Sequence, residues 1–175
     1  MHRAVFLDRD GVVNRKAPEG QYIVRWEDFE FLPGVPEGIR HLNEANFSVV
    51  VVSNQRCTAK GLITSHQLEH IHRCMIDELA AANAIIDAVY YCPHEVESQC
   101  ACRKPAPGML VRAAQEHSLD LNASWMVGDS DLDILAGKAA GCRTVRILRP
   151  ETAALVASDL IADSLLEAAV KILSS

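Results

Sequence analysis

Two carboxylates that lie two residues apart follow the first apolar run of the chain. Residues 4–7 are Ala-Val-Phe-Leu, Asp8 comes next, and Asp10 and Gly11 follow. Because residues i and i+2 of an extended chain point the same way, both carboxylates can face one ligand. One can attack an electrophile while the other transfers protons. Gly11 lets the chain turn close to that ligand.

Three further polar side chains could reach the same ligand. Ser53 and Asp129 lie at the ends of later expected strands, and Lys104 lies in the loop that follows another strand. In an open α/β sheet, ligands bind beyond the carboxyl ends of the strands, so we expect these groups to converge. Mg²⁺ bound by Asp8, Asp129 and the backbone carbonyl of Asp10 would cancel the repulsion between a carboxylate nucleophile and a phosphate. Lys104 would neutralise the nucleophile and the transferred group, and Ser53 would hold phosphoryl oxygens.

A second group of residues has the spacing of a metal site. Cys92, His94, Cys100 and Cys102 supply four soft or borderline ligands within eleven positions. A Cys₃His set suits tetrahedral Zn²⁺ with no open position, which is a structural site. Such an ion would stabilise a loop too short to form a core, and so fix the adjoining Arg103 and Lys104. A disulfide within this cluster is the alternative, although we expect reduced thiols in a chain without an export signal.

The elements that position these groups alternate along the chain. Five apolar, strand-like runs are separated by amphipathic stretches, which predicts βαβ units around a mainly parallel sheet. The expected strands are 4–7, 48–53, 86–92, 125–127 and 144–148, and the expected helices are 38–46, 65–83, 108–116, 131–140 and 164–173. Residues 14–34 are expected to form an irregular loop that reaches over the sheet edge, and residues 93–108 a second irregular loop.

Composition narrows the class of protein. The 175 residues, 49% of them apolar, predict a single domain spanning residues 1–175, and the net charge of −6 disfavours nucleic-acid binding. No apolar run is long enough for a membrane span, and a charge comes too early for a signal peptide. We therefore expect a cytoplasmic protein, and a monomer because no long apolar stripe is left over.

Several side chains near these motifs have simpler interpretations. Arg9 is expected to form a salt bridge at the rim, and Asp133 either orients Lys104 or caps a helix. Cys57 is expected to be a small buried thiol. Five histidines on helix-like stretches lack partner spacing and are expected to be solvated: His41, His66, His70, His72 and His117.

The four motifs together resemble those of the haloacid-dehalogenase-like (HAD) phosphatases. They read Asp8-x-Asp10-Gly11, Ser53-Asn54, Lys104 and Gly128-Asp129-x-x-x-Asp133, each in order and strand context. The resemblance implies a three-layer, Rossmann-like fold with a mainly parallel sheet and a minimal cap. It also implies that Asp8 is the nucleophile, that Asp10 is the general acid/base, and that Asp129 completes the Mg²⁺ site.

A narrower resemblance is to the D-glycero-D-manno-heptose-1,7-bisphosphate 7-phosphatases. It rests on residues 6–14 (FLDRDGVVN), 29–35 (FEFLPGV), 53–55 (SNQ), 90–94 (YYCPH) and 100–110 (CACRKPAPGML). That family removes one phosphate from a small phosphorylated sugar, on the route to lipopolysaccharide core or nucleotide-activated heptose. The resemblance implies substrate recognition by Asn54 and Arg103, and Gln55 and Tyr22 are further candidate contacts.

The sequence departs from that family in three places, one of which is a slightly long loop between Asn14 and Tyr22. Residues 56–61 (RCTAKG) replace the Ser-Gly-Ile-Ala-Arg-Gly that often follows Asn-Gln, which leaves sugar and anomer preference open. Only five residues separate His94 from Cys100, as in the related histidinol-phosphate phosphatases. Histidinol phosphate is thus the alternative substrate. A non-catalytic phospho-ligand binder and a zinc-centred binding module are the alternatives outside enzymes.

Overall fold

The computed structural model describes residues 2–150 and 154–175, and its strands form one six-stranded sheet. The strands are β1 (Ala4–Leu7), β2 (Ser48–Asn54), β3 (Ala88–Cys92), β4 (Trp125–Gly128), β5 (Arg143–Ile147) and β6 (Leu160–Ala162). Five α-helices accompany them: α1 (Val35–Glu44), α2 (Ser65–Ala81), α3 (Gly108–His117), α4 (Asp131–Ala140) and α5 (Leu165–Leu173). Three short 3₁₀ turns lie at Trp26–Asp28, Val96–Ser98 and Leu121–Ala123.

All neighbouring strands are parallel, in the order β3-β2-β1-β4-β5-β6. The order reverses beside β1, because the chain adds β2 and β3 on one side and β4 to β6 on the other. Ligands of open α/β sheets bind at such a switch point, beyond the carboxyl ends of the strands. The topology therefore places the ends of β1, β2 and β4 side by side.

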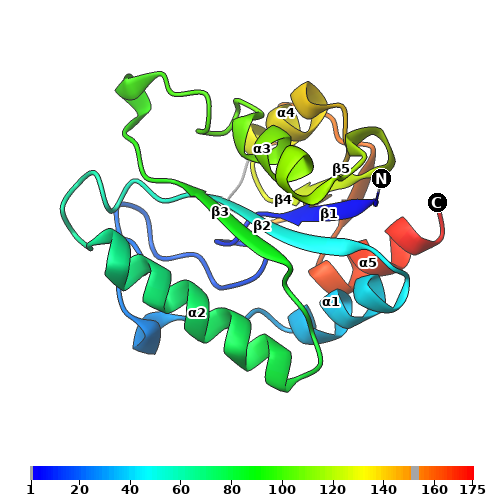
Figure 1. Cartoon of the computed structure of the whole chain (residues 1–175), viewed down its shortest axis with the longest axis horizontal. Helices are drawn as coiled ribbons and strands as arrows, with labels where there is room; N and C mark the ends of the chain where they lie inside the picture. The colour runs from blue at the N-terminus through cyan, green and yellow to red at the C-terminus, as the bar shows by residue number, and fades with distance from the viewer. Residues whose placement is uncertain (1, 151–153) are drawn as a thin grey trace.

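Helices cover both faces of the sheet, which makes three layers (Figure 1). One face packs against α1, α2 and α5, with Val5, Leu7, Val49 and Val51 in the shared core. The other packs against α3 and α4, with Phe6, Val50 and Met126 among the buried residues. Since both faces are covered, the central strands carry continuous apolar runs, such as Ala4–Leu7 and residues 49–52, rather than an alternating pattern.

Local signals fix the ends of the helices beside the sheet edge. Thr64 caps α2 through a capping box with Gln67, so the helix begins directly after the loop that follows β2. Ser130 caps α4, and both its backbone N–H and its hydroxyl donate to the Asp133 carboxylate. These caps fix the first residue of α2 and of α4, and therefore which residues of each helix face the sheet.

The mainly parallel α/β architecture expected from the sequence is confirmed, with ends that shift by a few residues. The unpredicted strand is β6, whose three residues are too few to show a pattern and which pairs only with β5. Within the described residues, no helix is long and apolar enough to cross a bilayer.

Candidate active site

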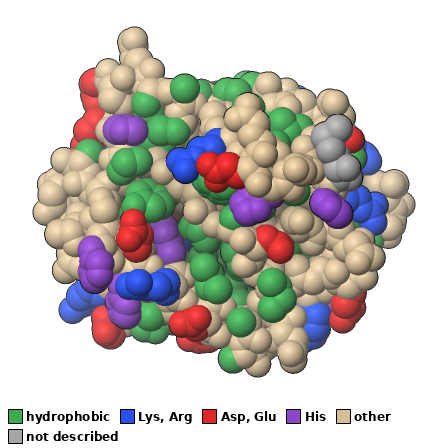
Figure 2. All heavy atoms as spheres, in the orientation of Figure 1, with side chains coloured by type: hydrophobic (Ala, Val, Ile, Leu, Met, Phe, Trp, Pro, Cys, Tyr) green, Lys and Arg blue, Asp and Glu red, His purple; other side chains and the backbone are tan. Residues whose placement is uncertain are grey.

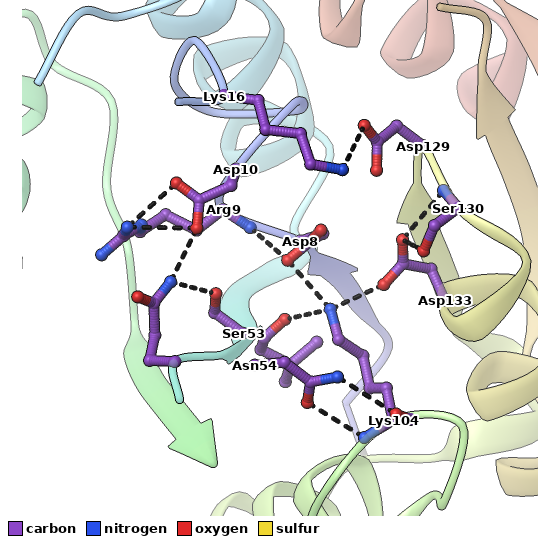
Figure 3. A network of polar contacts seen from close by, with 12 residues as sticks. Asp8, Arg9, Asp10, Lys16, Ser53, Asn54, Lys104, Asp129, Ser130 and Asp133 are labelled. Carbon is purple, nitrogen blue, oxygen red and sulfur yellow. Dashed lines mark hydrogen bonds and ion pairs between the residues drawn. The ribbon is translucent and has the colours of Figure 1, made fainter. Parts of the chain in front are cut away.

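Asp8, Lys104 and Asp133 form a buried chain of ion pairs at the ends of β1 and β4 (Figure 3). The Lys104 ammonium lies 2.9 Å from Asp8 Oδ1 and 2.6 Å from Asp133 Oδ1, and it also donates to the Val52 carbonyl at 2.8 Å. The three N–H groups of the Lys104 ammonium can thus each donate to one acceptor, and the three acceptors belong to separate segments of the chain. Burial opposes the charge of Lys104, but the Asp133 and Asp8 carboxylates outweigh it and raise its pKa. The ammonium is therefore fixed and charged.

The nucleophile candidate Asp8 keeps one oxygen free. Its Oδ1 accepts from Lys104 and from the backbone N–H of Arg9, whereas Oδ2 accepts no hydrogen bond within the described chain. Burial, together with the negative charges of Asp133 and Asp129, raises the pKa of Asp8, and Lys104 opposes the rise. A cation bound beside Asp8 would lower this pKa and keep the Asp8 carboxylate ionised.

Asp129 supplies the third carboxylate of a group that suits a divalent cation. Ligand atoms of Asp8, Asp129 and Asp133 all lie within 4.8 Å of one another. The three carboxylates face two ammonium groups, Lys104 and the more exposed Lys16, which leaves an excess of one negative charge. Asp129 Oδ1 is buried without a hydrogen-bond partner in the described structure, and oxygen ligands are those that Mg²⁺ prefers. The residues present therefore fit Mg²⁺, with Asp8 and Asp129 as side-chain ligands.

Close packing around these carboxylates explains two glycines. Gly11 has a φ of +93°, and a Cβ there would collide with the Asp129 carboxylate. A Cβ at Gly128 would collide with the side chain of Asp133. Larger residues at either position would push the carboxylates apart.

Asp10 points away from Asp8 and lies among hydrogen-bond donors. Its carboxylate accepts from Arg9 Nη2 at 2.9 and 3.1 Å, from Asn14 Nδ2 at 2.9 Å and from Gln55 Nε2 at 2.7 Å. Burial alone would raise the pKa of Asp10, but the Arg9 charge and these hydrogen bonds lower it. Asp10 is therefore a carboxylate in this state. Gln55 also donates to Ser53 Oγ at 2.8 Å, which links two predicted site residues.

A cavity of about 450 Å³ opens above these groups. It brings together the predicted active-site and substrate-contacting residues, namely Asp8, Asp10, Tyr22, Ser53, Asn54, Gln55, Arg103, Lys104 and Asp129. The Arg56 guanidinium donates to the Tyr22 hydroxyl at 2.7 Å, and Arg103 donates to the His94 carbonyl at 3.1 Å. The Asn54 amide already makes two hydrogen bonds with the Lys104 backbone, so its contact with substrate stays a prediction.

Two expectations from the sequence are wrong. Arg9 forms the expected salt bridge, with Asp10 at 2.9 Å, but it does not lie at the rim, because it is 0% exposed. His72 is not solvated: it is 5% exposed and lies 3.2 Å from Arg9, on the inner face of α2. His66 and His70 are exposed as expected, and Figure 2 shows histidine side chains on the surface where α2 crosses the view. Asp133 serves both suggested roles, since it pairs with Lys104 and bonds Ser130.

Sequence reasoning did not single out three charged residues that line the cavity: Lys16, Glu19 and Arg56. Lys16 belongs to the irregular loop that lines the cavity, and its ammonium lies 3.7 Å from Asp129 Oδ2. Its only signal is that it lies close in sequence after the Asp8-x-Asp10 pair. The sequence predicts that this loop reaches over the sheet edge, but nothing in its pattern shows that Lys16 is the residue that lies beside Asp129.

The four predicted zinc ligands converge on one point beyond β3. The sulfur atoms of Cys92, Cys100 and Cys102 lie 3.3–3.5 Å apart, and His94 Nδ1 lies 3.3 Å from Cys102 and 3.5 Å from Cys92. A disulfide would need a separation of about 2.05 Å, so all three cysteines are free thiols. The set of one nitrogen and three sulfurs suits tetrahedral Zn²⁺.

Comparison with known proteins first gives the class. Residues 101–168 match the HAD-hydrolase-like family model, and that stretch includes Lys104, Asp129 and Asp133. The crystal structure of D,D-heptose 1,7-bisphosphate phosphatase from B. bronchiseptica, in complex with magnesium and phosphate, superposes with a TM-score of 0.86 at 31% identity over 98% of each chain. The enzyme of the same name from Burkholderia thailandensis gives 0.69 at 27% identity over 99% of each chain. The fold and the site thus define a HAD-type hydrolase.

Curated relatives then give the family. The D-glycero-beta-D-manno-heptose-1,7-bisphosphate 7-phosphatase of Yersinia pestis is 39% identical over 173 residues, which cover 93% of this chain and 90% of the relative. The Rhodopseudomonas palustris protein of that name is 39% identical over 145 residues, 79% of each chain. The chain therefore belongs to the family of D-glycero-D-manno-heptose-1,7-bisphosphate 7-phosphatases.

Proposed function

We propose that this protein is a Mg²⁺-dependent phosphatase that removes the 7-phosphate of D-glycero-D-manno-heptose 1,7-bisphosphate, in the synthesis of heptose precursors of lipopolysaccharide. The observation that carries the proposal is the arrangement of Asp8, Lys104 and Asp129 at the floor of the cavity. Membership of the family supports the sugar substrate.

Asp8, Asp129 and the backbone carbonyl of Asp10 would hold the Mg²⁺ ion. Its charge would offset the excess negative charge of the three carboxylates and draw phosphoryl oxygens toward Asp8. The magnesium and phosphate bound to the B. bronchiseptica enzyme support this assignment.

Asp8 acts as the nucleophile. Its free Oδ2 forms a bond to phosphorus while the bond between phosphorus and the sugar oxygen breaks, which leaves a phosphate ester on Asp8. The Lys104 ammonium, held by three fixed acceptors, balances the negative charge of the attacking and transferred groups. Ser53 and the backbone amides that follow it hold the phosphoryl oxygens.

Asp10 transfers the protons. A phosphate dianion that enters the cavity adds negative charge beside Asp10 and favours its protonated form. The acid then gives its proton to the departing sugar oxygen. In the second step Asp10 takes a proton from water, the water oxygen bonds to phosphorus, and the bond to Asp8 breaks, which frees the Asp8 carboxylate and inorganic phosphate. As phosphate leaves, Asp10 releases to solvent the proton that it took up from solvent when the substrate bound, and it returns to the carboxylate form.

Cations around the cavity suit the phosphate that is not cleaved. Arg56, Arg103 and Lys16 line the cavity beyond the buried floor. The Tyr22 hydroxyl orients the Arg56 guanidinium, which keeps its remaining N–H donors for a ligand. Arg56 also lies in the segment that departs from the family pattern, so it is our candidate for recognition of the second phosphate.

We further propose that Cys92, His94, Cys100 and Cys102 hold a structural Zn²⁺ ion that fixes the adjoining Arg103 and Lys104. Reduced thiols fit a cytoplasmic protein. We propose that residues 1–175 act as one domain and one monomer, without a nucleic-acid or membrane partner. Light scattering during size-exclusion chromatography tests the monomer.

The experiment that tests the function is a phosphate-release screen of purified protein with Mg²⁺. The substrates are both anomers of heptose 1,7-bisphosphate, histidinol phosphate and simple hexose phosphates. We expect the highest kcat/KM for one heptose bisphosphate anomer, no release after EDTA treatment, and release of the 7-phosphate by ³¹P NMR. A higher kcat/KM for histidinol phosphate would overturn the substrate, and no release from any compound would overturn the enzyme class.

A further inference from the structure

Arg9 is a fully buried arginine that the mechanism above does not use. It lies between the nucleophile and the proton-transfer group in sequence, and its Nη2 donates to both Asp10 oxygens. Its Nη1 lies 3.2 Å from Nε2 of His72, which is also buried. Two side chains therefore fix the guanidinium, one on each terminal nitrogen.

The chemistry of this contact determines the protonation of His72. An arginine side chain has donors and no acceptor, so His72 Nε2 must accept, and the proton of the neutral ring must be on Nδ1. Burial, together with the positive charge of Arg9, lowers the pKa of His72 to about 3, which agrees with a neutral ring.

The surroundings hold the imidazole in place. His72 lies on α2, which begins at the Thr64 capping box, and its ring lies 5.5 Å from that of Tyr91 on β3. Neighbouring α2 residues Leu68 and Ile71 pack in the same small core as Cys57. No described residue of α2 lines the cavity, so His72 can reach the site only through Arg9.

A neutral acceptor suits this position better than a carboxylate would. A carboxylate here would share the positive charge of Arg9 and weaken its hold on Asp10, whereas an imidazole satisfies Nη1 and leaves that charge to Asp10. Arginine has many rotamers, and fixing its guanidinium at both terminal nitrogens fixes where Asp10 lies.

We infer that His72 is a positioning residue of the active site: its imidazole holds the Arg9 guanidinium, and Arg9 in turn holds the carboxylate of Asp10 in place for proton transfer. The inference rests on the role of Asp10 in the proposed function.

The test compares two substrates that differ in their need for a proton. A sugar oxygen needs a proton from Asp10 to leave, whereas p-nitrophenolate leaves without one. Because kcat/KM reports the steps up to and including departure of the leaving group, the comparison isolates the acid step. We expect His72→Leu to lower kcat/KM for the sugar phosphate about tenfold more than for p-nitrophenyl phosphate.

Matched variants separate this role from a general loss of structure. His72→Gln places a carbonyl acceptor near the position of Nε2 and should restore most of the activity toward the sugar phosphate. His70→Leu, at an exposed position of the same helix, should behave as wild type. An equal fall for both substrates, no fall for either, or a Gln variant as impaired as the Leu variant would overturn the inference.

A spectroscopic measurement does not depend on activity. In ¹⁵N spectra of histidine-labelled protein at pH 7, His72 should carry its proton on Nδ1 and none on Nε2. A proton on Nε2 would overturn the inference even if the Leu variant did not fold. Wild-type protein inactive on both substrates would instead reject the proposed function, and this spectrum would still test the contact with Arg9.

Discussion

The side-chain amide of Asn54 makes two reciprocal hydrogen bonds with the backbone of Lys104. Its Nδ2 donates to the Lys104 carbonyl at 3.0 Å, and its Oδ1 accepts from the Lys104 N–H at 3.0 Å. The end of β2 is thereby joined to the segment that follows the zinc ligands. Lys104 belongs to a loop, and these two hydrogen bonds fix the position of its backbone. The Lys104 side chain extends from that fixed backbone to Asp8.

Asn54→Ala should therefore lower kcat more than it raises KM. We expect about a tenfold lower kcat, because Lys104 shifts, together with a loss of about 2 kcal/mol in the free energy of unfolding. Asn43 provides a matched control, since it makes the same pair of bonds with the backbone of Ile85 far from the cavity. Asn43→Ala should lose similar stability and keep kcat, as steady-state kinetics and urea denaturation would show. A raised KM with unchanged kcat for Asn54→Ala would make Asn54 a substrate ligand instead.

Asp8→Asn should abolish turnover while the fold is retained. The amide is a poor nucleophile, so phosphate release should fall by about a thousandfold or more. The circular dichroism spectrum should not change, and phosphate should still bind in the presence of Mg²⁺ by calorimetry. Asp77→Asn, at an exposed position on α2, is the matched control and should keep full activity. Substantial turnover by the Asp8 variant would remove Asp8 from the role of nucleophile.

Cys100→Ser should remove zinc and lower activity without altering a group that contacts substrate. Because Cys102 directly precedes Arg103 and Lys104, a loosened loop should lower kcat about tenfold. Mass spectrometry should find one zinc per wild-type chain and much less in the variant. Cys74→Ser, on α2, should keep the full zinc content. Wild-type protein without stoichiometric zinc would contradict the structural site.

Arg56→Met should raise KM for the bisphosphate and leave a monophosphate unaffected. Loss of one charged hydrogen-bond donor to a phosphate corresponds to about tenfold in KM, provided that Arg56 contacts the second phosphate. Arg73→Met, at an exposed position on α2, is the control. Equal changes in KM for the bisphosphate and the monophosphate would show that Arg56 does not bind the second phosphate.

His72 should make the protein less stable as the pH falls below about 6.5. The unfolded chain takes up a proton on this histidine near pH 6.5, whereas the native state, with the pKa of His72 lowered to about 3, does not. The unfolded state then binds more protons, so the free energy of unfolding falls by up to about 1.4 kcal/mol per pH unit between these values. The full contribution of His72 is present only above pH 6.5.

Urea denaturation at pH 7.5, 6.5 and 5.5 would measure this loss. The fall between pH 6.5 and 5.5 should be about 1 kcal/mol smaller in His72→Gln than in wild type. His70→Gln should retain the wild-type dependence, because His70 is exposed. Identical pH dependence in wild type and the His72 variant would contradict a buried neutral imidazole.

The chemical groups of the site could be predicted from the sequence because strand ends and ligand spacings are local properties. Asp8, Ser53 and Asp129 follow apolar runs that can only be buried strands, and parallel strands bring their ends to one edge. Likewise, the four proposed zinc ligands lie within eleven positions of the chain, so a single loop can bring them together.

The hydrogen-bond partner of each group follows from the packing of the whole chain. The sequence predicts Arg9 at the rim and His72 in solvent, because no local pattern shows that two residues far apart in sequence will be buried together. Packing of α2 brings the two side chains into contact. The same holds for the two bonds from Asn54 to Lys104 and for Lys16 beside Asp129. The pattern of apolar runs predicts which groups follow the strands, because periodicity is local. The hydrogen-bond partners of these groups, and the place of a loop residue such as Lys16, depend on contacts between distant segments that form only when the whole chain packs.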